Sequence, residues 1–286
     1  MRTIGSGAGR RFLSRGHPIR ATLHSMFNLT PTVRTLLFIN IGVFLLQTQL
    51  ASRMNFLALY PVGSAYFQPW QFVTHMFMHG GWGHLLANMF GLISFGPLLE
   101  QRWGGNRFLA FWLICGLGAG VLYSGVRYYE VNRMRQDIEV FRQQPTDVHL
   151  QDFVEHNMPE YAEAFAPNIR QLHATPDDQQ LIQSALVSLE DMYASSLNSP
   201  MLGASGALFG ILFAFAYLFP NTELMLLFFP FPIKAKYFVA LYALYELYSG
   251  VYRTPGDNVA HFAHIGGMLI GFILLKIWER GRARFY

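Results

Sequence analysis

The sequence predicts an all-α membrane protein, with six transmembrane helices and a soluble insertion between the third and the fourth. Of its 286 residues, 52% are hydrophobic and only 13% are charged, whereas soluble domains carry about 25% charged residues. The mean hydropathy is +0.24. This composition excludes a disordered chain and argues against a soluble enzyme. The apolar residues also fall into long runs, which can be compared with the roughly 20 residues that cross a bilayer.

Six apolar runs are candidate spans. The third run contains no charged residue. The second and the fifth are the least hydrophobic: Glu100 ends the second, and the fifth contains Glu246. In chain order the runs are Val33–Leu50, His84–Leu99, Phe108–Val126, Met201–Phe219, Tyr237–Val251 and Val259–Trp278.

The charged residues divide the chain into unlike parts. Residues 127–199 hold 12 of the 17 acidic residues and 5 of the 21 basic ones, a net charge of −7 against +11 for the rest. We therefore expect an acidic, partly helical insertion outside the membrane. The predicted organisation is an N-terminal tail (1–32), core helices one to three (33–126) with a membrane-associated loop (51–82), the insertion (127–199), core helices four to six (200–278) and a C-terminal tail (279–286).

The basic residues predict an orientation, because cytoplasmic segments of membrane proteins carry an excess of Lys and Arg. Only Arg53 and Arg253 lie in the short loops of the opposite side. Both termini are therefore predicted to be cytoplasmic, in a bacterial-type plasma membrane. The basic pI of about 9.2 then reflects topology, and no nucleic-acid partner is expected. The N-terminal tail lacks an adjacent apolar run, so we expect no cleaved signal peptide. The inside residues are Arg2, Arg10, Arg11, Arg15, Arg20, Arg34, Arg102, Arg107, Lys234, Lys236, Lys276, Arg280, Arg282 and Arg284.

Two helices are predicted in the insertion. Thr175 is typical of a helix N-cap and Pro176 of a first helical position, with Asp177 and Asp178 in the first turn. Apolar residues then recur at helical spacing: Leu181, Ala185, Leu189, Met192 and Tyr193. The segment from Arg127 to Gln144 is the second helical candidate.

Polar residues within the predicted spans are candidates for function, because they are costly at membrane depth. The single Cys excludes a disulfide scaffold or a multi-Cys metal site. Taken alone, a Gly-Ala-Ser-Gly run is more often helix packing than a site. Three clusters on different spans make the stronger case: His75, His79, His84 and Asn88; Gly203, Ala204, Ser205 and Gly206; and His261 to Gly267.

The predicted orientation brings Ser205, His264 and His84 to the outer half of the bilayer, where they meet the requirements of acyl transfer. Ser205 is a nucleophile with His264 as its base, and backbone N–H groups at a helix start, His84 and Asn88 are possible oxyanion donors. Glycines four residues apart favour close approach of the fourth and sixth predicted spans: Gly206 with Gly210, and Gly267 with Gly271. No acidic residue is clearly placed as a third member, although Glu246 is the only carboxylate inside the spans. A Ser–His dyad is the simpler interpretation.

The sequence at this point resembles the rhomboid intramembrane serine proteases, over roughly residues 33–126 and 200–278. The motifs are His-x-x-x-Asn (His84, Asn88), Gly-x-Ser-x (Gly203 to Gly206) and Ala-His-Ile-Gly-Gly (Ala263 to Gly267). The resemblance implies a six-helix rhomboid bundle, Ser205 as nucleophile and His264 as base. It implies an oxyanion hole of His84, Asn88 and the Ser205 backbone N–H. It also implies a structural role for Glu100-x-x-x-Gly104.

Three features depart from the family pattern. Trp70 is followed by Gln71, where the family often has Trp-Arg, so the loop anchor is expected to differ. Phe209 stands where the family often has a Tyr that stacks on the catalytic His, and it keeps the ring. The insertion is long, and it is either a device that gates or recruits substrate or a tolerated surface decoration. Gly203, Gly206, Phe209, His261 and Gly267 are expected to support the site.

The leading interpretation is a serine endopeptidase that acts on transmembrane protein substrates in the lipid bilayer, with no metal and no cofactor. We expect His75 and His79 to be structural, and His261 to support the site or face the outer vestibule. One alternative is a catalytically silent rhomboid-like protein that binds membrane helices. Another is a membrane metalloprotein that uses His75, His79, His84, His261 and His264.

Overall fold

The computed structural model describes residues 29–226, 229–252, 254, 257 and 259–280. Most of the predicted tails and part of the basic residues used for the orientation therefore lie outside the described residues. The basic residues concerned are Arg2, Arg10, Arg11, Arg15, Arg20, Arg253, Arg282 and Arg284.

The described chain is mainly helical, and four of its helices are long and apolar enough to span a membrane. These four are α2 (Pro31–Leu50), α4 (Trp82–Trp103), α5 (Gly105–Gln143) and α11 (His261–Trp278). The apolar α9 (Ser205–Leu218) is shorter, and α10 (Ala235–Val251) has 17 residues. Length and composition thus identify an integral membrane protein with several apolar helices.

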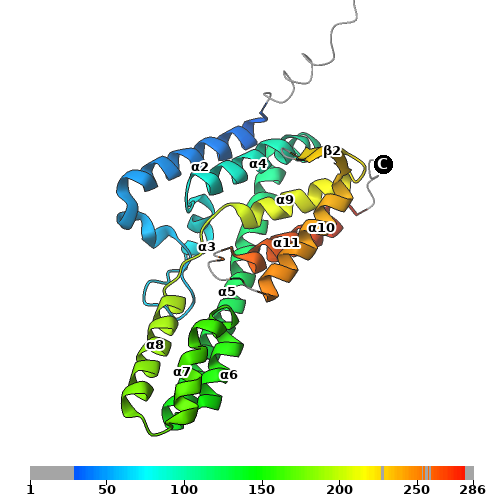
Figure 1. The fold of residues 1–286 in the computed structure, drawn as a ribbon. Helices are drawn as coiled ribbons and strands as arrows, with labels where there is room; N and C mark the ends of the chain where they lie inside the picture. The colour runs from blue at the N-terminus through cyan, green and yellow to red at the C-terminus, as the bar shows by residue number, and fades with distance from the viewer. Residues whose placement is uncertain (1–28, 227–228, 253, 255–256, 258, 281–286) are drawn as a thin grey trace, which may run out of the picture.

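Helix α9 lies inside the bundle, packed against α4, α5 and α11 (Figure 1). Of its 14 residues, 10 are buried, which is why the helix is apolar on every side. Glycines bring α9 close to its neighbours, because a Cβ atom on Gly267 of α11 would overlap the carbonyl oxygen of Gly206. On Gly210, a Cβ atom would lie 2.6 Å from Cys115 Sγ. The side of α9 that carries Ser205 is therefore held tightly against α11.

Glu100 and Glu279 tie together the helix ends that lie far from Ser205. The Glu100 carboxylate accepts hydrogen bonds from the backbone N–H groups of Thr32 and Val33, both at 2.9 Å, and so caps the start of α2. Glu279, directly after α11, accepts from Arg102 Nη2 at 2.6 Å and Trp103 Nε1 at 2.8 Å. These contacts fix the relative positions of α2, α4 and α11.

The segment that we expected as an insertion forms a helical bundle with its own core. It comprises the last part of α5, α6 (Asp147–Asn157), the 3₁₀ helix η3 (Pro159–Tyr161), α7 (Ala162–Ala174) and α8 (Gln179–Leu197), and it projects from the rest of the molecule (Figure 1). Its fully buried side chains include Phe141, Leu150, Phe153, Leu172 and Leu189. The predicted boundary at residue 127 lies within one continuous helix, because α5 joins the third apolar run to the 127–144 helix.

The predicted start of the second helix in the insertion is wrong. Helix α8 begins at Gln179, and its N-cap is Asp178, whose Oδ1 accepts from the backbone N–H groups of Gln180 and Leu181. Thr175 instead ends α7, and its hydroxyl donates to the Gln171 carbonyl. In the fourth apolar run, Met201 forms a β-bridge with Leu59, and helix α9 begins at Ser205, as expected for a serine at a helix start.

A two-stranded antiparallel hairpin adds to the predicted all-α architecture. Strand β1 (Glu223–Leu226) pairs with β2 (Phe229–Lys234), and the hairpin joins α9 to α10 at the end of the bundle far from Ser205 (Figure 1). The register pairs Glu223 with Lys234 and Leu224 with Ile233.

Candidate active site

Gln71 organises the loop that the sequence predicts as membrane-associated. Its fully buried side chain accepts from the N–H groups of Tyr60 (3.2 Å) and Gln68 (3.0 Å). It also donates to the carbonyls of Phe56 (3.0 Å) and Tyr66 (2.9 Å). All four hydrogen bonds go to backbone groups, so a neutral amide fixes this loop at the position where the family often has Arg.

The same loop supports the chain that enters α9. It contains η1 (Ala51–Leu57), α3 (Gln71–Thr74) and η2 (His75–Phe77). The His75 carbonyl accepts from Gly203 N–H at 2.9 Å, while Leu59 and Met201 exchange two backbone hydrogen bonds. The buried His75 ring contacts the Gln71 carbonyl through Nδ1 at 2.7 Å. His75 therefore contributes to the position of Ser205 through its backbone.

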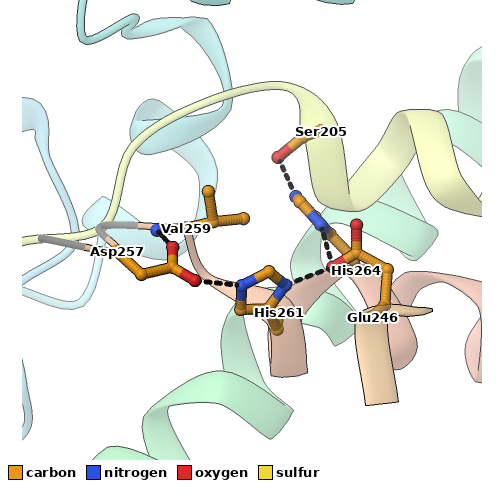
Figure 2. A network of polar contacts seen from close by, with 6 residues as sticks. All are labelled: Ser205, Glu246, Asp257, Val259, His261 and His264. Carbon is orange, nitrogen blue, oxygen red and sulfur yellow. Dashed lines mark hydrogen bonds and ion pairs between the residues drawn. The ribbon is translucent and has the colours of Figure 1, made fainter. Parts of the chain in front are cut away.

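Ser205 and His264 are in direct contact at the starts of α9 and α11. The serine Oγ lies 2.9 Å from His264 Nε2 (Figure 2). The histidine is 7% exposed, and the Phe209 ring stacks on it with a centroid distance of 4.0 Å and an interplanar angle of 11°. One ring face of His264 is thus covered, and its Nε2 points toward the hydroxyl.

A carboxylate that the sequence analysis did not assign to the site lies on the other side of His264. Glu246 Oε2, from α10, is 2.8 Å from His264 Nδ1 and 2.6 Å from His261 Nδ1 (Figure 2). The second ring nitrogen of His261 is 3.0 Å from Asp257 Oδ2. Glu246 and His261 are both buried, so His261 does not face an outer vestibule. The signal in the sequence was the isolated carboxylate within an apolar run.

His84 lies beside Ser205 because Gly203 leaves room for its ring. Gly203 has a φ of +128°, and a Cβ atom there would lie 2.7 Å from His84 Nε2 and 3.6 Å from Ser205 Oγ. His84 Nδ1 accepts from Gly80 N–H at 3.3 Å, so Nε2 is the ring nitrogen that carries a proton. This proton is directed toward the space around Ser205.

The other expected oxyanion donors are also near the start of α9. Asn88 is buried on α4, and its Nδ2 donates to the His84 carbonyl at 2.9 Å, which leaves its second N–H for another acceptor. Helix geometry leaves the backbone N–H groups of Ser205 and Gly206 without intrahelical acceptors. The site therefore combines a hydroxyl, an imidazole and several N–H donors.

The five histidines of the metalloprotein alternative do not form one cluster. The buried His79 ring packs edge-on against His84, with a centroid distance of 5.2 Å. In the described part of the chain, the group that could hold a metal is Glu246, His261 and His264, with ligand atoms within 4.8 Å of one another. The carboxylate–imidazole distances of 2.6 and 2.8 Å are those of hydrogen bonds. The ligands of a tetrahedral zinc ion lie roughly 3.3 Å apart, given metal–ligand bonds of about 2.0 Å. The two contacts of Glu246 are shorter than this, so they fit hydrogen bonds better than a pair of zinc ligands.

Comparison with known proteins identifies the class that this fold and this site define. The family model described as "Rhomboid domain" matches residues 66–131 and 180–280, which is more than half of the chain. The chain therefore belongs to the rhomboid family, and the resemblance seen in its motifs is confirmed. The unmatched stretch between these ranges covers most of the helical insertion.

The relatives with similar sequences include mitochondrial proteins. The chain is 30% identical to an uncharacterized mitochondrial rhomboid protein of Schizosaccharomyces pombe over 218 residues, which cover 74% of the chain and 52% of that protein. It is 38% identical to the mitochondrial Rhomboid protein 1 of Saccharomyces cerevisiae over 89 residues, 30% of the chain and 25% of that protein. The mitochondrial RHOMBOID-like protein 6 of Arabidopsis thaliana shares 42% identity over 55 residues, 19% of the chain and 18% of that protein. The chain thus spans about half the length of the first of these relatives.

Proposed function

We propose that the chain is an intramembrane serine endopeptidase that hydrolyses a peptide bond in or near the transmembrane segment of membrane-protein substrates. The contact between Ser205 Oγ and His264 Nε2 carries this proposal. A nucleophilic serine needs an adjacent base, and a membrane core tolerates such a polar pair only at a cost. Membership of the rhomboid family supports the same activity.

In this mechanism, Ser205 Oγ attacks the carbonyl carbon of the substrate while its proton passes to His264 Nε2. The tetrahedral intermediate then collapses, the C–N bond breaks, and His264 returns the proton to the leaving amine. Water next attacks the acyl-serine ester with His264 again as the base, which releases the acid product and restores the Ser205 hydroxyl. No cofactor enters these steps.

The developing oxyanion needs preorganised donors, each of which contributes about 3–4 kcal/mol in well-studied hydrolases. We assign this role to His84 Nε2–H, the second N–H of Asn88 and the backbone N–H of Ser205. The tautomer that Gly80 imposes on His84 supports the assignment. Gly203 supports it as well, because the absence of a side chain there leaves the His84 ring beside Ser205.

We propose that the six apolar helices, including α9 and α10, cross the membrane, with the site near one face. The described basic residues of the predicted inside segments lie at the other end of the helices: Arg34, Arg102, Arg107, Lys234, Lys236, Lys276 and Arg280. The helical insertion extends from the Ser205 end. This arrangement supports an orientation with the basic end on the positive-inside face.

A mitochondrial membrane fits this chain better than the bacterial-type plasma membrane expected from the sequence. Its relatives in Schizosaccharomyces pombe and Saccharomyces cerevisiae carry mitochondrial names. The first 28 residues contain five Arg and no Asp or Glu, a composition typical of mitochondrial targeting segments.

Cleavage of a tagged single-span membrane protein in proteoliposomes tests the proposed activity. Wild-type protein should release the cleaved fragment, and Ser205→Ala or His264→Ala should each lower the rate by at least about 10³-fold. A chelator should leave the wild-type rate unchanged, because the mechanism requires no metal. Undiminished cleavage by either variant would show that the proposed dyad is wrong, and a wild type that binds the substrate uncut would favour the silent binding protein.

A further inference from the structure

We propose that Glu246 is a positioning residue of the same reaction, so that the site works as a chain of Ser205, His264 and Glu246 and not as a dyad alone. This inference rests on the proposed endopeptidase function. Its basis is the geometry of the buried Glu246 carboxylate, which α10 places against the two histidines of α11. Helices α10 and α11 also approach each other closely at this point, since a Cβ atom on Gly250 would lie 3.3 Å from His261 Cβ.

The first consequence concerns the tautomer of His264. A carboxylate oxygen is an acceptor, so the contact of 2.8 Å requires the proton of neutral His264 to be on Nδ1. The lone pair of Nε2 then faces the Ser205 hydroxyl at 2.9 Å. Glu246 thereby keeps His264 in the tautomer that can accept the serine proton.

The second consequence concerns charge. Proton transfer from Ser205 converts His264, which is buried, into an imidazolium. A carboxylate at hydrogen-bond distance stabilises this cation, and in a low-dielectric site the stabilisation is larger than in water. Glu246 is only 2% exposed, so its charge acts on the histidine with little screening by solvent.

His261 holds the carboxylate from the other side. Its Nδ1 lies 2.6 Å from the Oε2 atom that His264 also contacts, and its Nε2 lies 3.0 Å from Asp257 Oδ2. Glu246 Oε2 is therefore contacted by both histidines of α11. A lone carboxylate is expensive to bury, whereas one that is paired and hydrogen-bonded is tolerated. His261 thus helps to hold the buried carboxylate in place beside the base.

Variants at position 246, measured as kcat and KM in the proteoliposome assay, test this role. Glu246→Gln keeps the size of the side chain and removes the charge, so kcat should fall by about 10²–10⁴-fold, with KM changed less than about 3-fold. Glu246→Asp restores the charge with a shorter reach and should give an intermediate kcat. Ser249→Ala is the matched control, because Ser249 is also a buried polar residue of α10, and its kcat should equal that of wild type.

The outcomes separate this inference from the function on which it rests. If Ser205→Ala abolishes cleavage while Glu246→Gln cleaves at the wild-type rate, the endopeptidase stands and the positioning role is overturned. An equal loss of kcat in Gln and Asp variants, together with a lowered unfolding temperature in both, shows a structural role and also overturns it. A wild type without hydrolytic activity overturns both proposals.

A measurement on the unaltered side chain covers the case in which Glu246→Gln does not fold. In wild-type protein with ¹⁵N-labelled histidine, the ring signals that disappear in His264→Ala belong to His264. These signals should show a protonated Nδ1 and an unprotonated Nε2. The opposite tautomer would contradict the proposal.

Discussion

Single residues without a polar side chain shape the environment of Ser205 as much as the polar ones do. Gly203 leaves space for the His84 ring, and its φ of +128° turns the chain into the start of α9. Phe209 covers one face of His264. The Ser205 and His264 side chains are thus held by a backbone conformation and by a stacked ring, both of which can be altered without removing either side chain.

Gly203→Ala tests the requirement for a glycine beside the serine. The new Cβ would displace the His84 ring and impose a backbone strain of about 1–3 kcal/mol. We expect kcat to fall at least about 10-fold, with the unfolding temperature lowered. Gly83→Ala is the control, since no atom lies within 4 Å of its Cβ position, and it should keep the wild-type kcat. Full activity of Gly203→Ala would contradict the predicted place of His84 in the site.

At the same scale, the sequence indicated some residues of the candidate site and not others. Ser205, His264, His84 and Asn88 belong to short motifs on separate spans, which made them visible in the sequence. Glu246 belongs to no motif, and its partners lie 15 and 18 residues away on another helix. Its role depends on how α10 is rotated against α11, and no periodicity of a nearly uniform apolar helix reveals that rotation.

Among the helices, the contact between α9 and α11 decides whether Ser205 and His264 meet. The backbones approach closely where Gly206 faces Gly267 and Gly210 faces Gly271. Small residues permit such approach in membranes, where packing and not the hydrophobic effect drives helix association. The glycine spacing predicted this contact correctly.

Gly267→Ala tests this contact. The methyl group would overlap the Gly206 carbonyl oxygen, so the helices must separate, at a cost of about 1–3 kcal/mol in the free energy of unfolding. A separation of about 1 Å can also lower the rate of an aligned reaction about 100-fold. The matched control is Gly42→Ala in α2, where no atom lies within 4 Å of the Cβ position. Equal unfolding temperatures and rates for both variants would show that the close approach is not required.

The helix ends were less predictable than the helices. Composition does not mark where the third span leaves the membrane, because α5 continues as one helix from an apolar to a charged stretch. Asp178 and Thr175 are both good capping residues, and the choice between them depends on which backbone N–H groups the folded chain leaves unpaired. The sequence did not predict the β1–β2 hairpin, because its strands are short. Their apolar residues also resemble those at the ends of the flanking helices.

At the scale of the whole molecule, the two larger of the apolar cores formed by the described residues are separate. One is formed by the membrane helices and the other by the last part of α5 with α6, α7 and α8. At the base of the insertion, Arg127 joins α5 to the end of α8, because its guanidinium donates to the Ser196 carbonyl at 2.8 Å. The charge distribution set the acidic segment apart from the rest of the chain. Its buried core residues show that it is a folded unit.

Leu189→Ala tests the independence of the two cores. Leu189 is fully buried in the second core, so the substitution should destabilise that bundle by about 2–5 kcal/mol. Hydrogen–deuterium exchange should speed up in α6, α7 and α8, while α9 and α11 keep their protection. Val187→Ala, on the exposed side of α8, should leave all exchange rates unchanged. Loss of protection throughout the molecule after Leu189→Ala would mean that the cores unfold as one.

The central claim, that Ser205 is a nucleophile activated by His264, is tested most directly by mapping covalent modification with a fluorophosphonate. Mass spectrometry of labelled wild-type protein should locate the phosphonyl group on Ser205. His264→Ala should slow the labelling by at least about 100-fold, whereas the control Ser249→Ala should label at the wild-type rate. Labelling of another residue, or equal labelling of Ser205 with and without His264, would contradict the account.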